Sequence, residues 1–461
     1  MLPNHSPWIK QLRRTRPVAH LPGDLATDIA VVGGGIAGVT TAYFLLRDTH
    51  KSVAILEAGK IAHGATGHNA GQAVTYFERS FSDLVKEFGL EKAAHGQKMI
   101  DNTWELIEEI YRDTQLETPF TRFTGYAGCS SIEQVTLHLQ NNAWRQKAGL
   151  NTEPIYVAKE CTQKEQIPSK FAALYSIVPQ EDILSLLETK DSRYIGLIVD
   201  PKGVVNSALF CEQLIAYMLN HFGGRFVLAE HTPVRTVRLK KDQAELQLDH
   251  VKVTARRVVL CTNGFTSINI ENEQGADIDT KFHHEVTGTV GYMAAYLEEL
   301  DHPPVGISYF VSPTVSTEDP YFYITRRAYE EEKNSHHNLV CIGGPERVLD
   351  HAHHYQPGDN FDEGVMKDID AFIRRTYVRA PKQVPFRFHW HGLMGYTRNR
   401  LRLVGFEPCN DVLMYNLGCN GTGILASICG SKRIADLVDG QVLPPSIFDP
   451  QDQRCELPRK K

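Results

Sequence analysis

The stretch that most constrains the fold is Asp-Ile-Ala-Val-Val-Gly-Gly-Gly-Ile-Ala-Gly-Val-Thr-Thr-Ala, residues 28–42. Its apolar run, Ile29–Val32, predicts a buried strand that leads directly into Gly33-x-Gly35-x-x-Gly38 and a helix-compatible segment. In this pattern the first glycine permits a tight turn, the second lets the backbone approach a pyrophosphate, and the third lets the helix pack close to the strand. The N–H groups that open such a helix attract phosphates. The stretch therefore predicts an α/β protein that binds a dinucleotide.

The residues after this unit extend the same prediction. A second apolar run, residues 52–56, predicts the next strand and ends at Glu57. A carboxylate about 20 residues beyond the glycines suits ribose hydroxyls. Residues 59–72 are glycine-rich and small, so they cannot form a regular packed element. Because this loop follows Glu57 so closely, we expect it to lie against the same ligand.

Length and composition exclude several classes of protein. A chain of 461 residues is too long for one hydrophobic core, which predicts two domains. No apolar run approaches the ~20 residues of a membrane span, and the net charge of −6 offers no basic field for nucleic acid. We therefore expect a soluble protein with no integral membrane segment and no nucleic-acid partner. The nine cysteines form no CxxC, which suggests neither a metal site nor a disulfide framework and favours a reducing cytoplasm.

The order of elements predicts how the domains are built. Strand–turn–helix patterns of the nucleotide-binding kind occur at the start, in the middle and at the end of the chain, with helical and strand-rich material inserted twice. This order predicts a discontinuous Rossmann-like domain interleaved with an α+β domain that contains a mainly antiparallel sheet. The expected bounds are 24–85, 193–270 and 389–445 for the first domain, 86–192 and 271–388 for the second, 1–23 for a loosely ordered arm and 446–461 for a tail.

Four separated motifs, in the same order, resemble those of the glycine oxidase and D-amino-acid oxidase family of FAD-dependent amine oxidoreductases, which includes sarcosine-oxidase-like members. They are the glycine-rich turn with Glu57, residues 64–72, the block Trp-His-Gly-Leu-Met-Gly-Tyr-Thr within 390–405, and the run 418–423. The resemblance covers roughly residues 26–440. Residues 69–72 and 262–265 resemble most the branch that acts on putrescine derivatives and D-amino acids.

The resemblance implies FAD as the cofactor, bound by residues of all four motifs. The glycines of 418–423 would open a helix whose dipole stabilises negative charge on the reduced flavin. The implied cofactor-binding residues are Gly33, Gly35, Ile36, Ala37, Gly38, Glu57, Ala58, Gly64, Ala65, Thr66, His68, Asn69, Ala70, Gly71, Gln72, Val234, Thr262, Asn263, Gly264, Gly392, Gly418, Asn420, Gly421, Thr422, Gly423 and Ile424.

The family chemistry implied is oxidation of an amine or amino acid at its C–N bond, with hydride transfer to flavin N5. The imine then hydrolyses to a carbonyl compound plus ammonia or amine, and oxygen or an electron carrier accepts the electrons. Leu425 stands where sarcosine-oxidase relatives carry a lysine, so oxygen activation by that route is not implied. Arg326 resembles the family arginine that binds a substrate carboxylate, with Arg327 on the opposite side of the strand and one of the two exposed to solvent. Tyr321 and Tyr323 are further candidates for the substrate pocket.

His68 has two alternative roles. Its setting, Thr-Gly-His-Asn-Ala-Gly at residues 66–71, resembles that of the histidine to which the flavin is covalently attached in the dimethylglycine-dehydrogenase branch. In the first alternative His68 contacts the flavin and bonds it covalently. In the second it is a loop histidine that makes a hydrogen bond to phosphate or backbone.

Three other functions compete with amine oxidation. An NAD(P)H-dependent flavin reductase or monooxygenase would need a second dinucleotide fingerprint, which the sequence lacks. A non-catalytic flavoprotein that serves in assembly or interaction is compatible with the same fold. A member that acts on a secondary amine of a modified nucleoside would need a basic face, against which the net charge argues.

Overall fold

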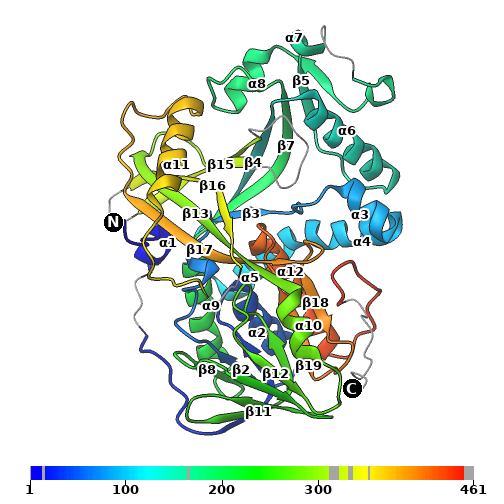
Figure 1. Cartoon of the computed structure of the whole chain (residues 1–461), viewed down its shortest axis with the longest axis vertical. Coiled ribbons are helices and arrows are strands. Elements are labelled where there is room, and N and C mark those ends of the chain that lie inside the picture. The colour runs from blue at the N-terminus through cyan, green and yellow to red at the C-terminus, as the bar shows by residue number, and fades with distance from the viewer. Residues whose placement is uncertain are drawn as a thin grey trace.

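The computed structural model describes residues 2–12, 16–162, 167–310, 321–330, 336–350 and 354–450. Within these residues the chain forms two sheets, one of nine strands and one of ten, with helices around and between them. Figure 1 shows the nine-stranded sheet at the lower end of the molecule and the ten-stranded sheet above it. This is the α/β architecture with an interleaved second domain that the order of elements predicts.

Five strands of the nine-stranded sheet are parallel, in the order β8-β2-β1-β11-β19. The glycine motif directly follows the central strand of these five, β1. The order with β1 at the centre is that of a dinucleotide-binding sheet. The remaining strands extend the sheet beyond β11 and β19. The bounds are β1 Leu25–Val32, β2 Val53–Leu56, β8 Phe226–Ala229, β9 Thr236–Leu239, β10 Ala244–Gln247, β11 Lys252–Leu260, β12 Asn269–Asn272, β18 Leu403–Phe406 and β19 Leu413–Leu417.

Helix α2 (Ile36–Asp48) follows the glycine turn and is buried along almost its whole length. It packs against α12 (Gly423–Val438) and α9 (Ser207–His221), which accounts for apolar residues on every side of it. Gly38 allows α2 to pack closely on β1 and its turn, because a Cβ there would lie 1.8 Å from the carbonyl oxygen of Gly33. The glycine of this turn that packs helix on strand is therefore sterically required.

The ten-stranded sheet is mainly antiparallel, in the order β17-β13-β16-β15-β14-β4-β7-β5-β6, with β3 paired to β7. Only the β14/β4 and β5/β6 pairs among its described strands are parallel. Its bounds are β3 Gln72–Val74, β4 Phe120–Cys129, β5 Ile155–Ala158, β6 Ser176–Val178, β7 Gly196–Val205, β13 Val286–Glu299, β14 Val305–Phe310, β15 Tyr321–Glu330, β16 His336–Val348 and β17 Phe388–Thr397.

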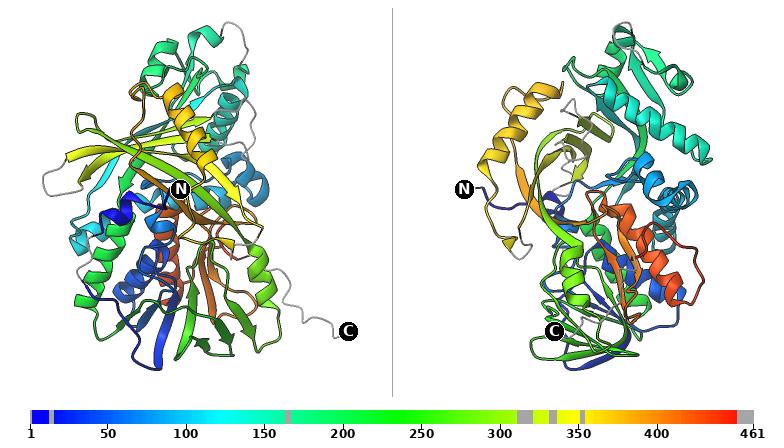
Figure 2. Two further views of the ribbon diagram at one scale, coloured as in Figure 1. Left: turned by 60° about the vertical axis from the view of Figure 1, so that its left-hand side comes forward. Right: turned by 45° about the vertical axis from the view of Figure 1, so that its right-hand side comes forward.

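The other helices cover the two sheets. Helix α11 lies on the face of the ten-stranded sheet turned away from the nucleotide motif (Figure 2), where Phe372 stacks on Phe322 of β15. Their bounds are α1 Pro7–Lys10, η1 Ala65–Gly67, α3 Phe81–Phe88, α4 Leu90–Asp101, α5 Thr103–Thr114, α6 Ile132–Lys147, α7 Lys159–Thr162, η2 Ser169–Phe171, α8 Gln180–Leu186, α10 Ile278–Glu285 and α11 Glu363–Thr376.

Three strands lie outside the domain that the expected bounds give them. Strand β3, which falls within the expected segment 24–85, is hydrogen-bonded to β7 and so belongs to the ten-stranded sheet. The boundaries at 193 and 389 assign β7 and β17 to the nucleotide domain. Strand β7 is hydrogen-bonded to β4 over ten residue pairs, and β17 is bonded to β13 over ten. Both strands therefore belong to the ten-stranded sheet. Alternation of side chains could not reveal this, because either sheet would bury such strands.

The N-terminal segment is packed rather than loosely ordered, contrary to expectation. Ser6 caps α1 by accepting a hydrogen bond from the N–H of Trp8, and the indole of Trp8 is fully buried. Its Nε1 donates to the carbonyl oxygen of Asn69, and a Cβ at Gly71 would lie 2.9 Å from its ring. Burial of the indole outweighs the cost of ordering this proline-containing segment.

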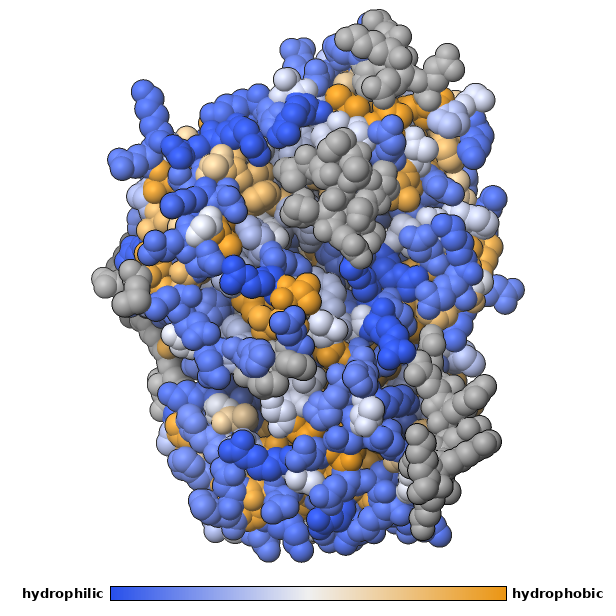
Figure 3. All heavy atoms as spheres, in the orientation of Figure 1, coloured by the Kyte–Doolittle hydropathy of each residue, from blue (hydrophilic) through white to orange (hydrophobic). Residues whose placement is uncertain are grey.

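The surface in Figure 3 is mostly hydrophilic, with apolar side chains in small scattered groups. None of the described helices combines the length and the apolar character needed to cross a lipid bilayer. Six of the described cysteines are free thiols. Cys409 is disulfide-bonded, an outcome that the cysteine spacing did not suggest.

Candidate active site

A cavity of about 950 Å³ lies between the two sheets. One side is formed by the carboxyl ends of the parallel strands, where Val32, Leu56 and Cys261 line it. The opposite side is formed by β13, β14, β15 and β16, and the N-terminus of α12 adds Gly423. Ligands of open α/β sheets bind at the carboxyl ends of the strands. The position of the cavity therefore matches that of a nucleotide site.

The glycine turn after β1 opens directly onto this cavity. Gly33 has a φ of +108°, which permits the turn between strand and helix. A Cβ at Gly35 would lie 2.9 Å from Oγ1 of Thr66, and the N–H of Ile36 donates to that same oxygen at 2.9 Å. Without a side chain at Gly35, the backbone that opens α2 borders the cavity. This geometry suits a pyrophosphate at the helix N-terminus.

Glu57 lines the cavity at the end of β2 and also fixes the turn. Its Oε2 accepts from the N–H of Gly34 at 2.6 Å, and its Oε1 accepts from the N–H of Gly59 at 2.7 Å. Burial raises the pKa of Glu57, while these two amides act in the opposite direction. Each carboxylate oxygen keeps a second lone pair that a ribose hydroxyl could use.

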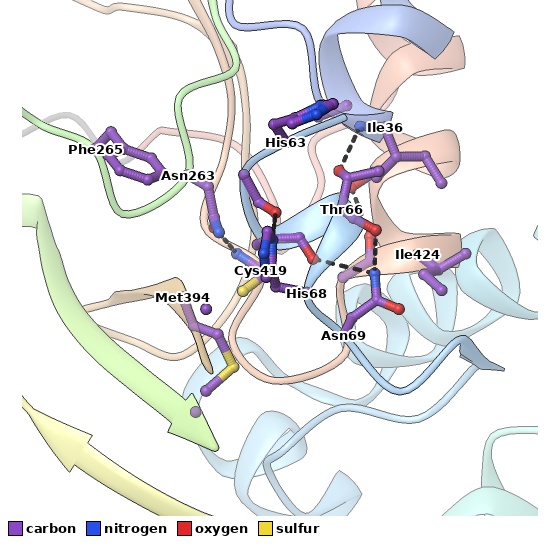
Figure 4. A pocket seen from close by; sticks show the side chains of 18 of the residues that line it. Ile36, His63, Thr66, His68, Asn69, Asn263, Phe265, Met394, Cys419 and Ile424 are labelled. Carbon is purple, nitrogen blue, oxygen red and sulfur yellow. Dashed lines mark hydrogen bonds between the residues drawn. The ribbon is translucent and has the colours of Figure 1, made fainter. Parts of the chain in front are cut away.

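The loop 64–72 is held in shape by its own side chains, as Figure 4 shows for Thr66, His68 and Asn69. Nδ2 of Asn69 donates to the carbonyl oxygens of Ala65 and Thr66 and to Ser207. Oδ1 of Asn69 accepts from the N–H of Gly71 at 2.7 Å. The loop contains a short 3-10 turn and has no other regular structure before Gln72, where β3 begins, as its composition predicts.

His68 lies in the middle of this loop and lines the cavity. Its Nδ1 donates to the carbonyl oxygen of Gly64 at 2.9 Å. Of the two ring nitrogens, Nε2 is therefore the one that can contact a bound group. Burial lowers the pKa of His68 to about 4, which leaves the ring neutral near pH 7. Gly392 allows the close approach of β17, since a Cβ there would lie 2.9 Å from Cβ of His68.

The glycine-rich turn before α12 is fixed to β17 and to the end of β11. Asn263, at a φ of +52°, accepts at Oδ1 from the N–H groups of Gly395 and Cys419. Asn420, at a φ of +46°, accepts at Oδ1 from the N–H of Thr397 at 2.8 Å. These bonds place Gly421 and the following residues against the cavity.

Most of the expected site residues line this one cavity although they come from distant parts of the chain. They are Gly33, Gly35, Ile36, Ala37, Glu57, Ala58, Gly64, Ala65, Thr66, His68, Asn69, Ala70, Gly71, Gln72, Val234, Thr262, Asn263, Tyr323, Gly392, Gly421, Thr422, Gly423 and Ile424.

Four of the expected cofactor residues do not line the cavity but support those that do. Gly38 packs α2 on β1, and Gly264 passes so close to β17 that a Cβ would lie 2.5 Å from the carbonyl oxygen of Met394. Gly418 has a φ of +84°, and Asn420 ties the turn to Thr397. These residues shape the site without facing it.

The expected role of Arg326 is wrong. Its side chain is buried on the face of β15 that is turned away from the cavity. Its guanidinium donates to both carboxylate oxygens of Glu188, at 2.7 and 2.9 Å, and to the hydroxyl of Tyr377 at 2.6 Å. Burial raises the pKa of Glu188, but the hydrogen bonds from Arg326 and Tyr377 and the charges of Arg326 and Arg379 together lower it below its usual value. Arg326 thus anchors β15 in the fold and does not bind substrate.

Its neighbour Arg327 does lie on the other side of the strand, as predicted, but neither arginine is exposed. The guanidinium carbon of Arg327 stacks 4.2 Å from the ring of Trp8, and Nη2 donates to Gln11 at 2.6 Å. Both arginines of this pair are therefore structural, because each is already bound to protein groups.

The end of the cavity formed by the ten-stranded sheet holds residues that the motifs did not indicate. Tyr76, Glu78, Ser308 and Glu346 line it, together with Tyr321 and Tyr323, which the sequence suggested as pocket residues. They come from four separate segments and have no fixed spacing. Only alternation along β15, which places residues 321 and 323 on one face, gave any signal in the sequence.

Comparisons with known proteins agree with this geometry. A family model described as "FAD dependent oxidoreductase" matches residues 28–437. Gamma-glutamylputrescine oxidoreductase of Escherichia coli (strain K12) is 24% identical over 265 residues, which are 56% of this chain and 54% of that protein. The chain matches about half, or less, of the length of its curated relatives.

Two solved structures share the fold over nearly the whole chain. Glycine oxidase from Geobacillus kaustophilus has a TM-score of 0.66 at 17% identity, with 95% of this chain and 100% of that chain covered. L-proline dehydrogenase from P. horikoshii has a TM-score of 0.66 at 14% identity, with 93% and 97% covered. At these identities the likeness concerns the fold.

Proposed function

Because this chain belongs to the family of FAD-dependent oxidoreductases, we propose that it oxidises the C–N bond of an amine or amino acid to an imine. The imine hydrolyses to a carbonyl compound plus ammonia or amine. One observation carries the proposal: a single cavity joins the glycine turn of residues 33–38 to a tyrosine-lined chamber on the ten-stranded sheet. A dinucleotide and a small substrate can therefore occupy one enclosure.

The described residues fit FAD. Oγ1 of Thr262 is buried beside the cavity and has no hydrogen-bond partner among the described residues, so a ligand would satisfy it. The turn 33–36 would hold the pyrophosphate, Glu57 the adenosine ribose, and the N-terminus of α12 the ring system. When bound, FAD supplies the acceptor for the hydride of the substrate.

The chain's own residues would bind and orient the substrate and exclude water from it. The tyrosine-lined chamber holds the amine, and its apolar members Met293 and Met394 limit the entry of water. Tyr323 is fixed by close packing, because a Cβ at Gly343 would lie 2.5 Å from its ring. In this proposal Tyr323 orients the substrate and His68 contacts the cofactor. Positioning of this kind is the main contribution that a protein makes to cofactor chemistry.

The names of the relatives support an amine substrate. They include gamma-glutamylputrescine oxidoreductase, glycine oxidase and L-proline dehydrogenase, which act on different C–N compounds by name. They do not choose between oxygen and an electron carrier as the final acceptor, and we keep both. For this chain we also propose a cytoplasmic location. The six free thiols among the described cysteines support it, whereas the disulfide of Cys409 argues against it.

Anaerobic bleaching of the visible flavin band tests the proposal. The purified FAD-loaded protein would be mixed with glycine, sarcosine, D- and L-amino acids, proline, and putrescine with its acylated forms. We expect one class of amine to bleach the band. A flavin that stays yellow with every amine would overturn the proposal and favour a non-catalytic role in assembly or interaction.

A further inference from the structure

We propose that the substrate carries a second, protonated amino group, which is held by Glu78, Glu346 and the surrounding tyrosines at the end of the cavity formed by the ten-stranded sheet. The substrate class would then be diamines and related polyamines rather than α-amino acids. This inference rests on the proposed function, because it identifies the substrate of the same site.

Glu78 is the first of the two carboxylates that line this end of the cavity. Its Oε1 accepts from the hydroxyl of Tyr321 at 2.9 Å, which leaves Oε2 for another donor. It lies against the turn before α12, since a Cβ at Gly421 would lie 3.0 Å from Cγ of Glu78. Glu78 is therefore beside the turn that opens onto the proposed cofactor site.

Glu346 is the second carboxylate, and it reaches the cavity from β16. Its Oε2 accepts from the hydroxyl of Tyr396 at 3.2 Å. The same hydroxyl would lie 3.1 Å from a Cβ at Gly421. Tyr396 and Gly421 thus bring the two carboxylates to the same side of the cavity.

Three tyrosines complete the enclosure. Tyr76, Tyr321 and Tyr323 line it, and the ring centroids of Tyr321 and Tyr323 are 5.8 Å apart. Tyrosine faces attract cations, and carboxylates accept charge-assisted hydrogen bonds from ammonium groups. A cavity with aromatic faces and two acids suits an ammonium ion far better than a carboxylate.

The nearby cations do not reverse this preference. Lys202 is buried behind Ser308, to which its Nζ donates at 3.2 Å, and it lies 5.8 Å from the ring of Tyr76. Arg400 interacts electrostatically with both Glu78 and Glu346. Neither cation is among the described residues that line the cavity.

Arg235 and Arg402 do line the cavity, but Arg235 pairs with Asp249 at 3.0 Å, and Arg402 donates to Asn416 and to the carbonyl oxygen of Gly418. These two guanidinium groups are therefore already bound to protein groups, and neither favours a substrate carboxylate at the tyrosine-lined end.

The acids suit a second amino group rather than the one being oxidised. An amine must be neutral to lose a hydride, whereas two adjacent carboxylates favour its protonated form. Burial and Glu78 raise the pKa of Glu346 to about 7, against the opposing effects of Tyr396 and Arg400. Binding of a cation should therefore strengthen as the pH rises through about 7 and Glu346 becomes ionised.

Matched substrates test the proposal with the FAD-loaded protein. Diaminoalkanes would be compared with the monoamines and ω-amino acids of the same chain length in anaerobic flavin reduction. We expect kcat/KM for reduction by the best diamine to exceed that for its monoamine by about tenfold or more, with the ω-amino acid slowest. Glu346→Gln and Glu78→Gln should each bring the diamine-to-monoamine ratio close to one.

Two control variants show whether charge at this position is responsible. Glu346→Asp keeps the charge and should restore part of the preference. Glu108→Gln removes a surface carboxylate that pairs with Arg122 at 2.7 Å, and it should leave the ratio unchanged. An ω-amino acid or α-amino acid as the best substrate, or an unchanged ratio in Glu346→Gln, would overturn the inference.

Calorimetry separates this inference from the proposed function, since it requires no turnover. Diamine would be titrated into FAD-loaded wild type and Glu346→Gln. If no amine reduces the flavin but the diamine binds wild type about tenfold more tightly than the variant, the proposed oxidation fails while the cation site stands. Equal binding to both proteins would overturn the cation site itself.

Discussion

At the scale of single residues, Arg326 shows how a side chain of the right type can serve structure instead of function. The resemblance placed a carboxylate-binding arginine on this strand, and a carboxylate is indeed bound, but it is that of Glu188. The alternation of β15 decides the outcome, because Tyr321, Tyr323 and Arg327 share the face opposite to Arg326. Because neighbouring residues of a strand point to opposite faces, a shift of one residue along β15 changes a side chain that faces the cavity into one that is buried on the other side.

Replacement of this anchor should affect stability rather than catalysis. Arg326→Met leaves Glu188 and the Tyr377 hydroxyl buried without their donor, so we expect the free energy of unfolding to fall by about 3–5 kcal/mol. The KM for the amine substrate should stay unchanged. Urea denaturation and steady-state kinetics on FAD-loaded protein would measure both quantities.

The pH dependence of that stability has a definite sign. Because Arg326 lowers the pKa of Glu188 in the folded state, the pair contributes fully above the unfolded pKa of about 4.3 and is lost as the pH falls through the folded pKa. The acid-side loss of stability should shrink in Arg326→Met.

The matched control is Arg374→Met, which breaks an exposed pair with Asp370. It should lower the free energy of unfolding by less than about 1 kcal/mol. A raised KM with unchanged stability would contradict the anchor role.

His68 is the residue whose two alternative roles can be separated most simply. Its hydrogen bond to Gly64 and its neutral ring explain its presence as a loop residue that contacts the cofactor. We therefore expect acid precipitation of the FAD-loaded protein to leave the yellow colour in the supernatant. Colour retained in the pellet of wild type, and released from His68→Ala, would instead establish the covalent bond.

At the scale of elements, the N-terminal segment is another part of the site that no sequence motif indicated. Asn4, His5, Ser6, Ile9 and Lys10 line the cavity. The hydroxyl of Ser6 donates to the carbonyl oxygen of Gly67 at 2.5 Å, and the indole of Trp8 donates to the carbonyl oxygen of Asn69 in the loop 64–72. The segment therefore closes the cofactor loop against the rest of the fold.

Removal of the indole that anchors this segment should weaken both fold and cofactor binding. Trp8→Ala should lower the free energy of unfolding by about 3–5 kcal/mol, since a large buried side chain is lost. We also expect faster dissociation of FAD, measured as the decrease in flavin absorbance after dilution. Trp144→Ala on α6, which removes a half-buried indole beside Lys147, should leave FAD dissociation unchanged. Equal FAD dissociation in Trp8→Ala and wild type would contradict the closing role.

At the scale of the whole molecule, the cavity lies where the two sheets meet, so its occupant joins them. Gln72 already connects the loop to the ten-stranded sheet by donating to Thr325 at 2.6 Å. A bound dinucleotide would contact residues of both sheets at once. The relative position of the two sheets is thus expected to depend on the cofactor.

Added FAD should stabilise the molecule as a single unit. Ligand at 100 times its Kd contributes about 2.7 kcal/mol when it binds only the folded state. We expect the Tm of FAD-free protein to rise by several degrees on addition of FAD, with one unfolding transition for the loaded form. Differential scanning calorimetry measures both, and a Tm independent of FAD concentration would contradict binding at this cavity.

The sequence by itself determined the nucleotide half of the site. The strand, the turn 33–38, Glu57 and the loop 64–72 are adjacent in the chain, and their requirements are local: a positive φ at Gly33, no room for a Cβ at Gly38, and a carboxylate at the end of a strand. Local backbone geometry can be inferred from residue type, so the fold class and the position of the cavity followed from it.

Only the tertiary structure decided the substrate half. Glu346 is far in the chain from the segment that carries Tyr76 and Glu78. They meet because β15 and β16 lie side by side and because Glu78 lies against Gly421 in the turn before α12. The same packing assigned Arg326 to Glu188, moved β7 and β17 into the larger sheet, and buried Trp8. Strand register and the choice between two sheets depend on long-range pairing, which spacing within a sequence does not encode.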